Sequence, residues 1–146
     1  MFDPRDCARQ IMEVVPAAMR SIRAEMRRQC ENQLSVPQFR TMAYLHRQPG
    51  ASLAAVAEHI GVTPPAMSRM VDRLVERGLV ARQSHPDSRR QLTLALTPHG
   101  AAMFEAARAR THDRIAGMLG TLAAEDLASI ESALTLLARV FVKGGS

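Results

Sequence analysis

The fold is decided by residues 63–97, TPPAMSRMVDRLVERGLVARQSHPDSRRQLTLALT. Thr63 has a side chain suited to capping a helix, and Pro64 at the first helical position needs no backbone donor. Gly78 is a typical helix stop. Between these ends, apolar residues recur every three or four positions, at Met67, Met70, Val71 and Leu74. The pattern predicts an amphipathic helix from Thr63 to Gly78.

Two short strands joined by a basic loop are predicted after this helix. Leu92, Leu94 and Leu96 alternate with polar or small residues, as in a half-buried strand. The preceding loop has no apolar residue between Gln83 and Gln91, so it cannot bury side chains in a core. The arginines on or next to this loop are Arg82, Arg89 and Arg90. Cationic side chains on such a loop favour a polyanionic partner.

A shorter helix is predicted just upstream. Ser52 can cap it and Gly61 closes it. Its buried stripe consists of Leu53, Val56 and Ile60. Only residues 61–62 separate it from Thr63, a connection short enough to make the two helices cross steeply. Together these elements predict a winged helix-turn-helix, a mostly α fold with a small β-wing.

The second helix of this motif is predicted to contact double-stranded DNA. Arg69 and Arg73 point away from the apolar stripe and suit guanine edges, whereas hydroxyls suit phosphates. The wing arginines suit the minor groove. The alternative is that the polar face is only the solvated side of an amphipathic helix. The candidate DNA-binding residues are Thr63, Pro65, Ser68, Arg69, Arg73, Arg82, Arg89 and Arg90.

The chain resembles the MarR family of bacterial transcriptional regulators over almost its whole length. The resemblance is carried by the run from Met67 to Gly78 with Leu79, Val80 and Arg82, by Arg89-Arg90, by Leu96-Thr97-Pro98-His99-Gly100, and upstream by Pro37-Gln38-Phe39 and the helix from Ala54 to Gly61. In one departure, Ser88 stands where the family usually has an aspartate, with Asp87 one position earlier. The resemblance implies a homodimer with interlocked N- and C-terminal helices, and usually a repressor. By resemblance, Arg90 matches the wing arginine that family members insert into the minor groove.

We expect one domain over residues 1–146, in which residues 1–35 and 98–146 form dimerisation helices. The winged helix-turn-helix would span 36–97, with the helix-turn-helix at about 52–78 and the wing at about 79–97. A single winged domain offers too little surface to cover both terminal apolar stripes, so a second copy is predicted, although packing on the chain's own domain is the alternative. A two-fold dimer predicts a pseudo-palindromic operator with half-sites about 34–36 Å apart. The stripes are Cys7, Ile11, Val15, Ala18, Ile22 and Met26, and then Leu127, Ile130, Leu134, Leu137 and Phe141.

Composition agrees with a polyanionic partner. The formal charge is +5 and the isoelectric point is near 10.5. Residues 98–146 hold five basic and five acidic side chains, so the excess lies in the first 97 residues. No apolar run is long enough to span a bilayer and the N-terminus lacks a secretory signal pattern. With two distant cysteines, the sequence predicts a cytoplasmic protein with reduced thiols.

The regulatory signal is predicted less directly. The resemblance implies a cleft for phenolic or carboxylate compounds, and we place Met19, Arg23, Met42, Leu45 and His46 in it, with ordinary core packing as the alternative. A second possibility is peroxide sensing through Cys7, whose thiol lies near Arg5, Arg9 and a helix start.

Other functional classes have weaker support in the sequence. The scattered histidines predict no metal site, no cofactor is expected, and motifs of catalysis are absent, so we predict that the chain is not an enzyme. A sequence-indifferent architectural DNA-binding protein remains an alternative, because a winged helix and excess positive charge serve that purpose too. A winged helix that contacts only proteins is disfavoured by the arginine-bearing loop.

Overall fold

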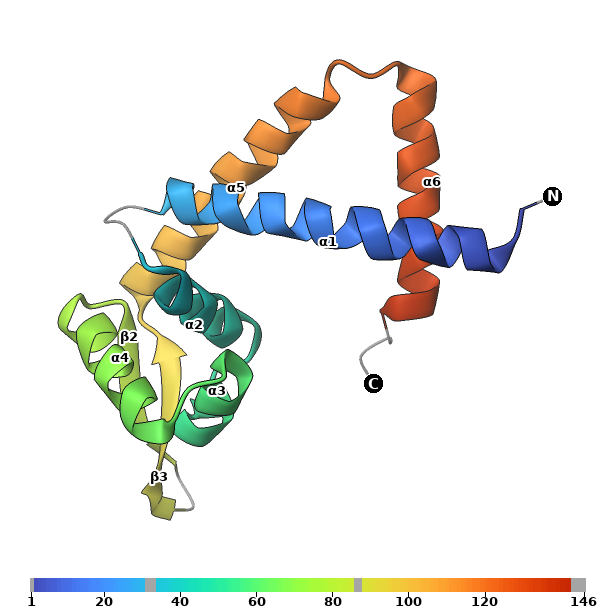
Figure 1. Ribbon diagram of the computed structural model, residues 1–146. Coiled ribbons are helices and arrows are strands. Elements are labelled where there is room, and N and C mark those ends of the chain that lie inside the picture. The colour runs from blue at the N-terminus through green and yellow to red at the C-terminus, as the bar shows by residue number, and fades with distance from the viewer. Residues whose placement is uncertain (1, 31–33, 86–87, 143–146) are drawn as a thin grey trace. The chain divides into compact units, whose positions relative to one another are not determined.

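The computed structural model describes residues 2–30, 34–85 and 88–142, and the side chains of residues 85–91 lie outside the described part (Figure 1). The chain divides into two compact units, Met1–Thr111 and His112–Ser146. Helix α5 (Pro98–Leu119) crosses this boundary. The two units are therefore described one at a time.

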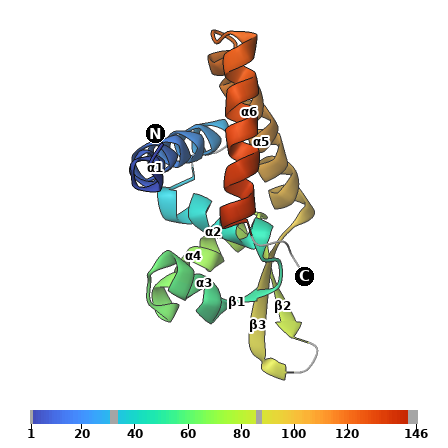
Figure 2. The ribbon, with the colours of Figure 1, turned by 90° about the vertical axis from the view of Figure 1, so that its right-hand side faces the viewer.

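The first unit contains the predicted winged helix-turn-helix. A three-stranded antiparallel sheet with strand order β1-β3-β2 lies beside three short helices (Figures 1 and 2). The prediction of a mostly helical fold with a small β-wing is confirmed. The elements before α5 are α1 (Pro4–Gln29), α2 (Val36–Arg47), β1 (Ala51–Ser52), α3 (Leu53–Ile60), α4 (Pro64–Glu76), β2 (Val80–His85) and β3 (Ser88–Leu96).

Local capping chemistry sets the ends of α3 and α4. The Ser52 hydroxyl accepts a hydrogen bond from the Ala55 N–H at 3.1 Å, and the Thr63 hydroxyl accepts one from the Ala66 N–H at 3.3 Å. Gly61 closes α3 in the left-handed region, with a φ of 85°. Such a conformation costs a glycine little because it has no Cβ. The short turn between the two helices therefore follows from the sequence in the predicted way.

The β2–β3 hairpin protrudes beyond α3 and α4 in both views (Figures 1 and 2). Its register pairs Val80 with Leu96 and Ser84 with Leu92, and a register shift follows Ser84. Leu94 is buried but Leu92 is 44% exposed, so the predicted half-buried alternation is wrong at its outer end. The reason is that Leu92 lies outside the segment of β3 that pairs with β1, which ends at Thr93.

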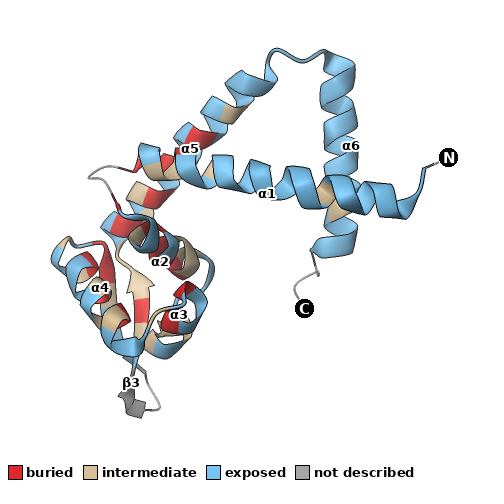
Figure 3. Ribbon diagram, in the orientation of Figure 1, coloured by how far each residue is buried: buried red, intermediate tan, exposed pale blue. Residues whose placement is uncertain are grey.

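The core lies between the helices and the inner part of the sheet, and most of its residues come from α2, α3 and α4 (Figure 3). Met42 and Leu45 of α2, which the sequence suggested for a ligand cleft, are fully buried here. The residues that meet them from the other elements include Val56, Met67, Val71, Leu74, Leu94 and Phe104.

A tight junction joins β3 to α5. The Thr97 hydroxyl donates to the Gly78 carbonyl at 2.6 Å and accepts from the Gly100 N–H at 2.9 Å. The Thr97 N–H donates to the Leu79 carbonyl at 3.0 Å. A Cβ at position 100 would lie 2.1 Å from that same Leu79 oxygen. Only glycine allows the start of α5 to come this close to the backbone after α4.

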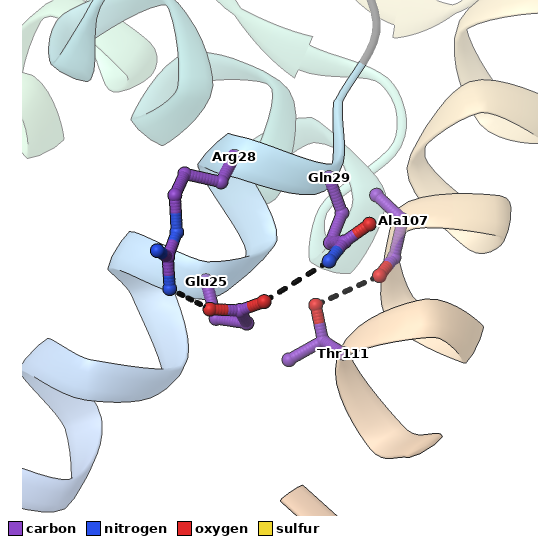
Figure 4. Close-up of polar contacts among 5 residues, drawn as sticks. All are labelled: Glu25, Arg28, Gln29, Ala107 and Thr111. Carbon is purple, nitrogen blue, oxygen red and sulfur yellow. Dashed lines mark hydrogen bonds and ion pairs between the residues drawn. The ribbon is translucent and has the colours of Figure 1, made fainter. Parts of the chain in front are cut away.

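The C-terminal end of helix α1 contacts α5. Glu25 is buried and its carboxylate accepts from Arg28 and, at 3.0 Å, from the Gln29 amide (Figure 4). Arg110 of α5 donates to the Gln29 carbonyl at 3.3 Å. Burial raises the pKa of the neighbouring Cys30 thiol, and the positive charge of Arg110 opposes this rise. The helix itself, expected from Asp6 to about Cys30, spans Pro4–Gln29.

The second unit contains the end of α5 and helix α6 (Ala124–Phe141). Helix α6 has no buried residue in the single chain, and most of its large apolar side chains are exposed (Figure 3). Leu134 is 58% exposed and Phe141 is 66% exposed. Among the described residues, no helix combines the length and apolar character that crossing a membrane requires.

Candidate nucleic-acid interface

Helix α4 turns one face to the core and one to solvent. Met67, Val71 and Leu74 are buried, while Arg69 and Arg73 are exposed on the other side. Pro65 and Thr63 are exposed at the N-terminal end, and Ser68 is half-buried. A helix with this distribution presents two guanidinium groups and its own N-terminus to a partner, both of which favour an anion.

Arg82 of β2 forms an ion pair with Asp72 of α4. Its guanidinium also donates to the Ser68 carbonyl at 3.5 Å. Both side chains are partly exposed, so the pair contributes little to stability, about 1 kcal/mol or less. Its geometric effect is larger, because it connects the outward face of α4 to the base of the hairpin. The sequence suggested a direct DNA contact for Arg82; the structure gives this side chain a partner within the chain.

The other wing arginines were predicted to contact the minor groove. The backbone of Arg89 and Arg90 lies in β3, but their side chains lie outside the described residues. Their backbone position is on the protruding part of the hairpin (Figure 2). Ser88, where the resemblance leads us to expect an aspartate, begins the same strand, and its side chain lies outside the described residues too.

A shallow groove of about 300 Å³ runs between the start of α2 and the exposed face of α4. Ser35 caps α2 there, in a reciprocal capping box with Gln38. Arg69 and Arg73 form the opposite side of the groove. The groove therefore brings the N-terminal end of α2 next to the two arginines of α4, an arrangement that sequence analysis missed because residues 38 and 69 are far apart in the chain.

A larger cleft of about 390 Å³ lies among α1, α2, α3 and α5, within the first unit. Three of the five residues suggested for a ligand cleft line it, namely Met19, Arg23 and His46. Met42 and Leu45 do not line it, because both are buried in the core. The remaining lining residues are Ile22, Met26, Phe39, Arg40, Ala43, Arg47, His59, Phe104 and Arg108.

The cleft combines aromatic and basic side chains. The His46 ring lies 4.6 Å from the Phe104 ring, and its Nε2 is 2.5 Å from the Glu105 carboxylate. The His59 ring stacks on Tyr44, with ring centroids 4.3 Å apart. Four arginines, Arg23, Arg40, Arg47 and Arg108, are among the lining residues. This set suits an aromatic molecule with an anionic group. The cleft draws on four elements, so the period of any one helix could not indicate it.

The structure also bears on the cysteines and on possible metal ligands. Cys7 is exposed on α1 and Cys30 is buried. Across the residues that the structure describes, no three His, Cys, Asp or Glu side chains gather as a metal site would require.

Comparison with known proteins gives a consistent result. Residues 34–92 match the model of the MarR family. The chain is 31% identical over 112 residues to the HTH-type transcriptional repressor MdtR of Bacillus subtilis, covering 76% of this chain and 72% of that protein. It is 36% identical over 91 residues to the HTH-type transcriptional repressor Rv2887 of Mycobacterium tuberculosis, covering 62% of this chain and 66%, just under two thirds, of that relative. Among solved structures, RV1404 of Mycobacterium tuberculosis is 29% identical, with a TM-score of 0.75 and 98% of both chains covered.

Proposed function

The chain belongs to the MarR family, and from this premise we propose that it is a sequence-specific DNA-binding transcriptional repressor. It would act as a homodimer and leave its operator when a small aromatic or carboxylate-bearing effector binds. Two of its relatives are named as HTH-type transcriptional repressors. The observation that carries the proposal is the exposed Arg69 and Arg73 face of α4 beside the protruding hairpin.

Helix α4 and the β2–β3 hairpin are proposed to contact different grooves of the DNA. Arg69 and Arg73 would contact base edges in the major groove, where a good bidentate contact provides about 1–3 kcal/mol of discrimination. At the start of α4, the Thr63 and Ser68 hydroxyls and the exposed Pro65 would contact the sugar-phosphate backbone of the DNA. Arg89 and Arg90 would follow the hairpin into the minor groove. Arg82 would act through Asp72, by holding the hairpin and α4 in one orientation.

The homodimer is proposed because both terminal helices have exposed apolar residues. Met12 and Val15 of α1 and Leu134 and Phe141 of α6 are open to solvent in the single chain. Large apolar side chains exposed along a helix are typical of an interface. Sedimentation at micromolar concentration should give a dimer, and Leu134→Glu should dissociate it. Ser132→Glu, which puts the same charge on the same helix, is the control; a monomeric wild-type protein would refute the dimer.

The effector site is proposed to be the cleft that Met19, Arg23 and His46 line. Its aromatic residues and arginines suit a phenolic acid, and Phe104 and Glu105 connect it to α5 through His46. An effector that binds there would shift the population of conformations that fit the operator. The alternative signal is oxidation of Cys7. Peroxide added to the protein–DNA complex would then release the wild-type protein from DNA but not the variant Cys7→Ser.

The decisive test is a titration against DNA from just upstream of the protein's own coding region, with random duplex of equal length, at several salt concentrations. We expect the upstream DNA to bind about a thousandfold or more tightly than the random duplex. Arg69→Gln should reduce this preference, whereas Arg5→Gln on α1 removes the same charge and should not. Equal affinity for both duplexes, repeated after selection from a random library, would instead indicate a sequence-indifferent binder.

A further inference from the structure

Helix α4 has two methionines whose surroundings differ. Met67 is fully buried in the core. Met70 is only partly buried; it packs against the same core and also lines the shallow groove of about 300 Å³ between α2 and α4. A small dissolved molecule can therefore reach Met70 from the groove, whereas the core shields Met67 from solvent.

The sulfur of Met70 makes a close contact with α2. It lies 3.5 Å from the hydroxyl oxygen of Thr41, a residue with no exposed surface. The same hydroxyl donates to the Pro37 carbonyl at 2.8 Å. A hydroxyl has one proton, and a carbonyl oxygen accepts it more strongly than a thioether does. The proton is therefore directed to Pro37, and the lone pairs of the sulfur stay available for reaction.

A peroxide converts a thioether to a sulfoxide by transferring one oxygen atom. The O–O bond of hydrogen peroxide breaks and an S–O bond forms; the sulfur is oxidised by two electrons and the peroxide is reduced to water. The product is bulkier and polar, and such a change disrupts packed apolar contacts. At Met70 the new oxygen would lie against the buried Thr41 or turn toward the groove. In the first position it pushes α4 away from α2.

The second position brings the oxygen to the arginines of the candidate interface. Arg69 and Arg73 line the same groove as Met70. Arg73 follows Met70 by three positions, so their side chains are neighbours on the helix. A thioether sulfur is only a weak acceptor, whereas a sulfoxide oxygen accepts readily from a guanidinium. Such a bond holds the arginine against its own helix, where it cannot also contact a base edge.

We propose that Met70 is a site of reversible oxidation by peroxide, and that its sulfoxide loosens α4 from α2 and engages the arginines beside it. Enzymes that reduce methionine sulfoxide would restore the thioether. A further consequence rests on the proposed function: if the chain is a DNA-binding regulator, oxidation of Met70 lowers its affinity for the operator. The chemistry differs from that of Cys7, because a thioether reacts without the thiolate that a cysteine needs.

The test uses the full chain with Cys7→Ser as the parent protein, so that the exposed thiol does not react. Hydrogen peroxide is added, and mass spectrometry of peptides follows the oxygen gained at each methionine. Met70 should react well before the buried Met42 and Met67. As Met70 reacts, the unfolding temperature should fall by about 4 °C or more, and the affinity for the upstream DNA should fall about tenfold.

Two variants separate Met70 from the other methionines. Met70→Leu has no sulfur and nearly conserves the volume of the side chain. It should bind DNA as the parent does, and the same treatment should leave its stability and affinity unchanged. Met118→Leu is the matched control, because Met118 is 61% exposed and lies outside α2 and α4. Treatment should weaken this variant as it weakens the parent.

Two results would overturn the proposal. One is a Met70 side chain that reacts no sooner than Met42 and Met67, because the groove would then give no access. The other is a treated Met70→Leu protein that loses as much stability as the treated parent. These two readouts need no DNA, so they decide the site even if the untreated protein has no preference for the upstream DNA. A treated parent that keeps both its preference and its affinity would refute the part played by the arginines.

Discussion

Replacing Gly100 with alanine tests the junction that joins the wing to α5. The added Cβ would lie 2.1 Å from the Leu79 carbonyl oxygen, and backbone rather than a flexible side chain must move. That oxygen also accepts the Thr97 N–H at 3.0 Å, so the shift strains a hydrogen bond as well. Overpacking of this kind costs about 3 kcal/mol, while alanine regains about 1 kcal/mol of helix propensity. The net loss of about 2 kcal/mol lowers Tm by about 4–8 °C.

Thermal unfolding followed by circular dichroism, at one fixed protein concentration, measures this loss. Gly117→Ala is the matched control, because it lies in the same helix and its added Cβ meets no described atom within 4 Å. That control should unfold at the wild-type temperature or above it. A Gly100→Ala protein as stable as the wild type would show that the junction has room to relax, and the argument for a rigid contact between Leu79 and α5 would fail.

Three further predictions concern individual side chains. Thr97→Val removes two hydrogen bonds of the hydroxyl and should lower the free energy of unfolding by about 1–3 kcal/mol, seen as a lower denaturant midpoint; an unchanged midpoint would contradict it. Iodoacetamide should alkylate the exposed Cys7 well before Cys30, because burial raises the pKa of the Cys30 thiol and reduces its thiolate fraction; mass spectrometry showing equal rates would disprove this. Asp72→Asn breaks the ion pair with Arg82 that is proposed to hold the hairpin and α4 in one orientation, so the preference for the operator over random duplex should fall; an unchanged preference in the DNA titration would contradict that role of Arg82.

The helix-turn-helix was predictable because local chemistry fixes its ends. Ser52 and Thr63 cap α3 and α4 through their own hydroxyls, and Gly61 takes the left-handed conformation that its position requires. Each interaction spans three residues or fewer along the chain. The apolar period then distinguishes the buried face of α4 from the exposed one, so the exposure of Arg69 and Arg73 also followed from the sequence alone.

The cleft proposed for the effector was only partly predictable because its lining depends on the direction of each side chain of α2. His46 and its neighbour Leu45 point to different sides of that helix, one into the cleft and one into the core. Which apolar face of a helix meets the core is decided by the elements packed on it. The sequence gives no such information for α2, where Met42 was assigned to the cleft and lies in the core.

The arginines show most clearly what sequence cannot separate. Eighteen of the nineteen basic residues are arginine, and composition treats them alike. In the structure, Arg82 of β2 pairs with Asp72 of α4, and Arg110 of α5 donates to the Gln29 carbonyl of α1. The arginines that connect elements are therefore distinguished by contacts between different helices and strands, which composition does not record.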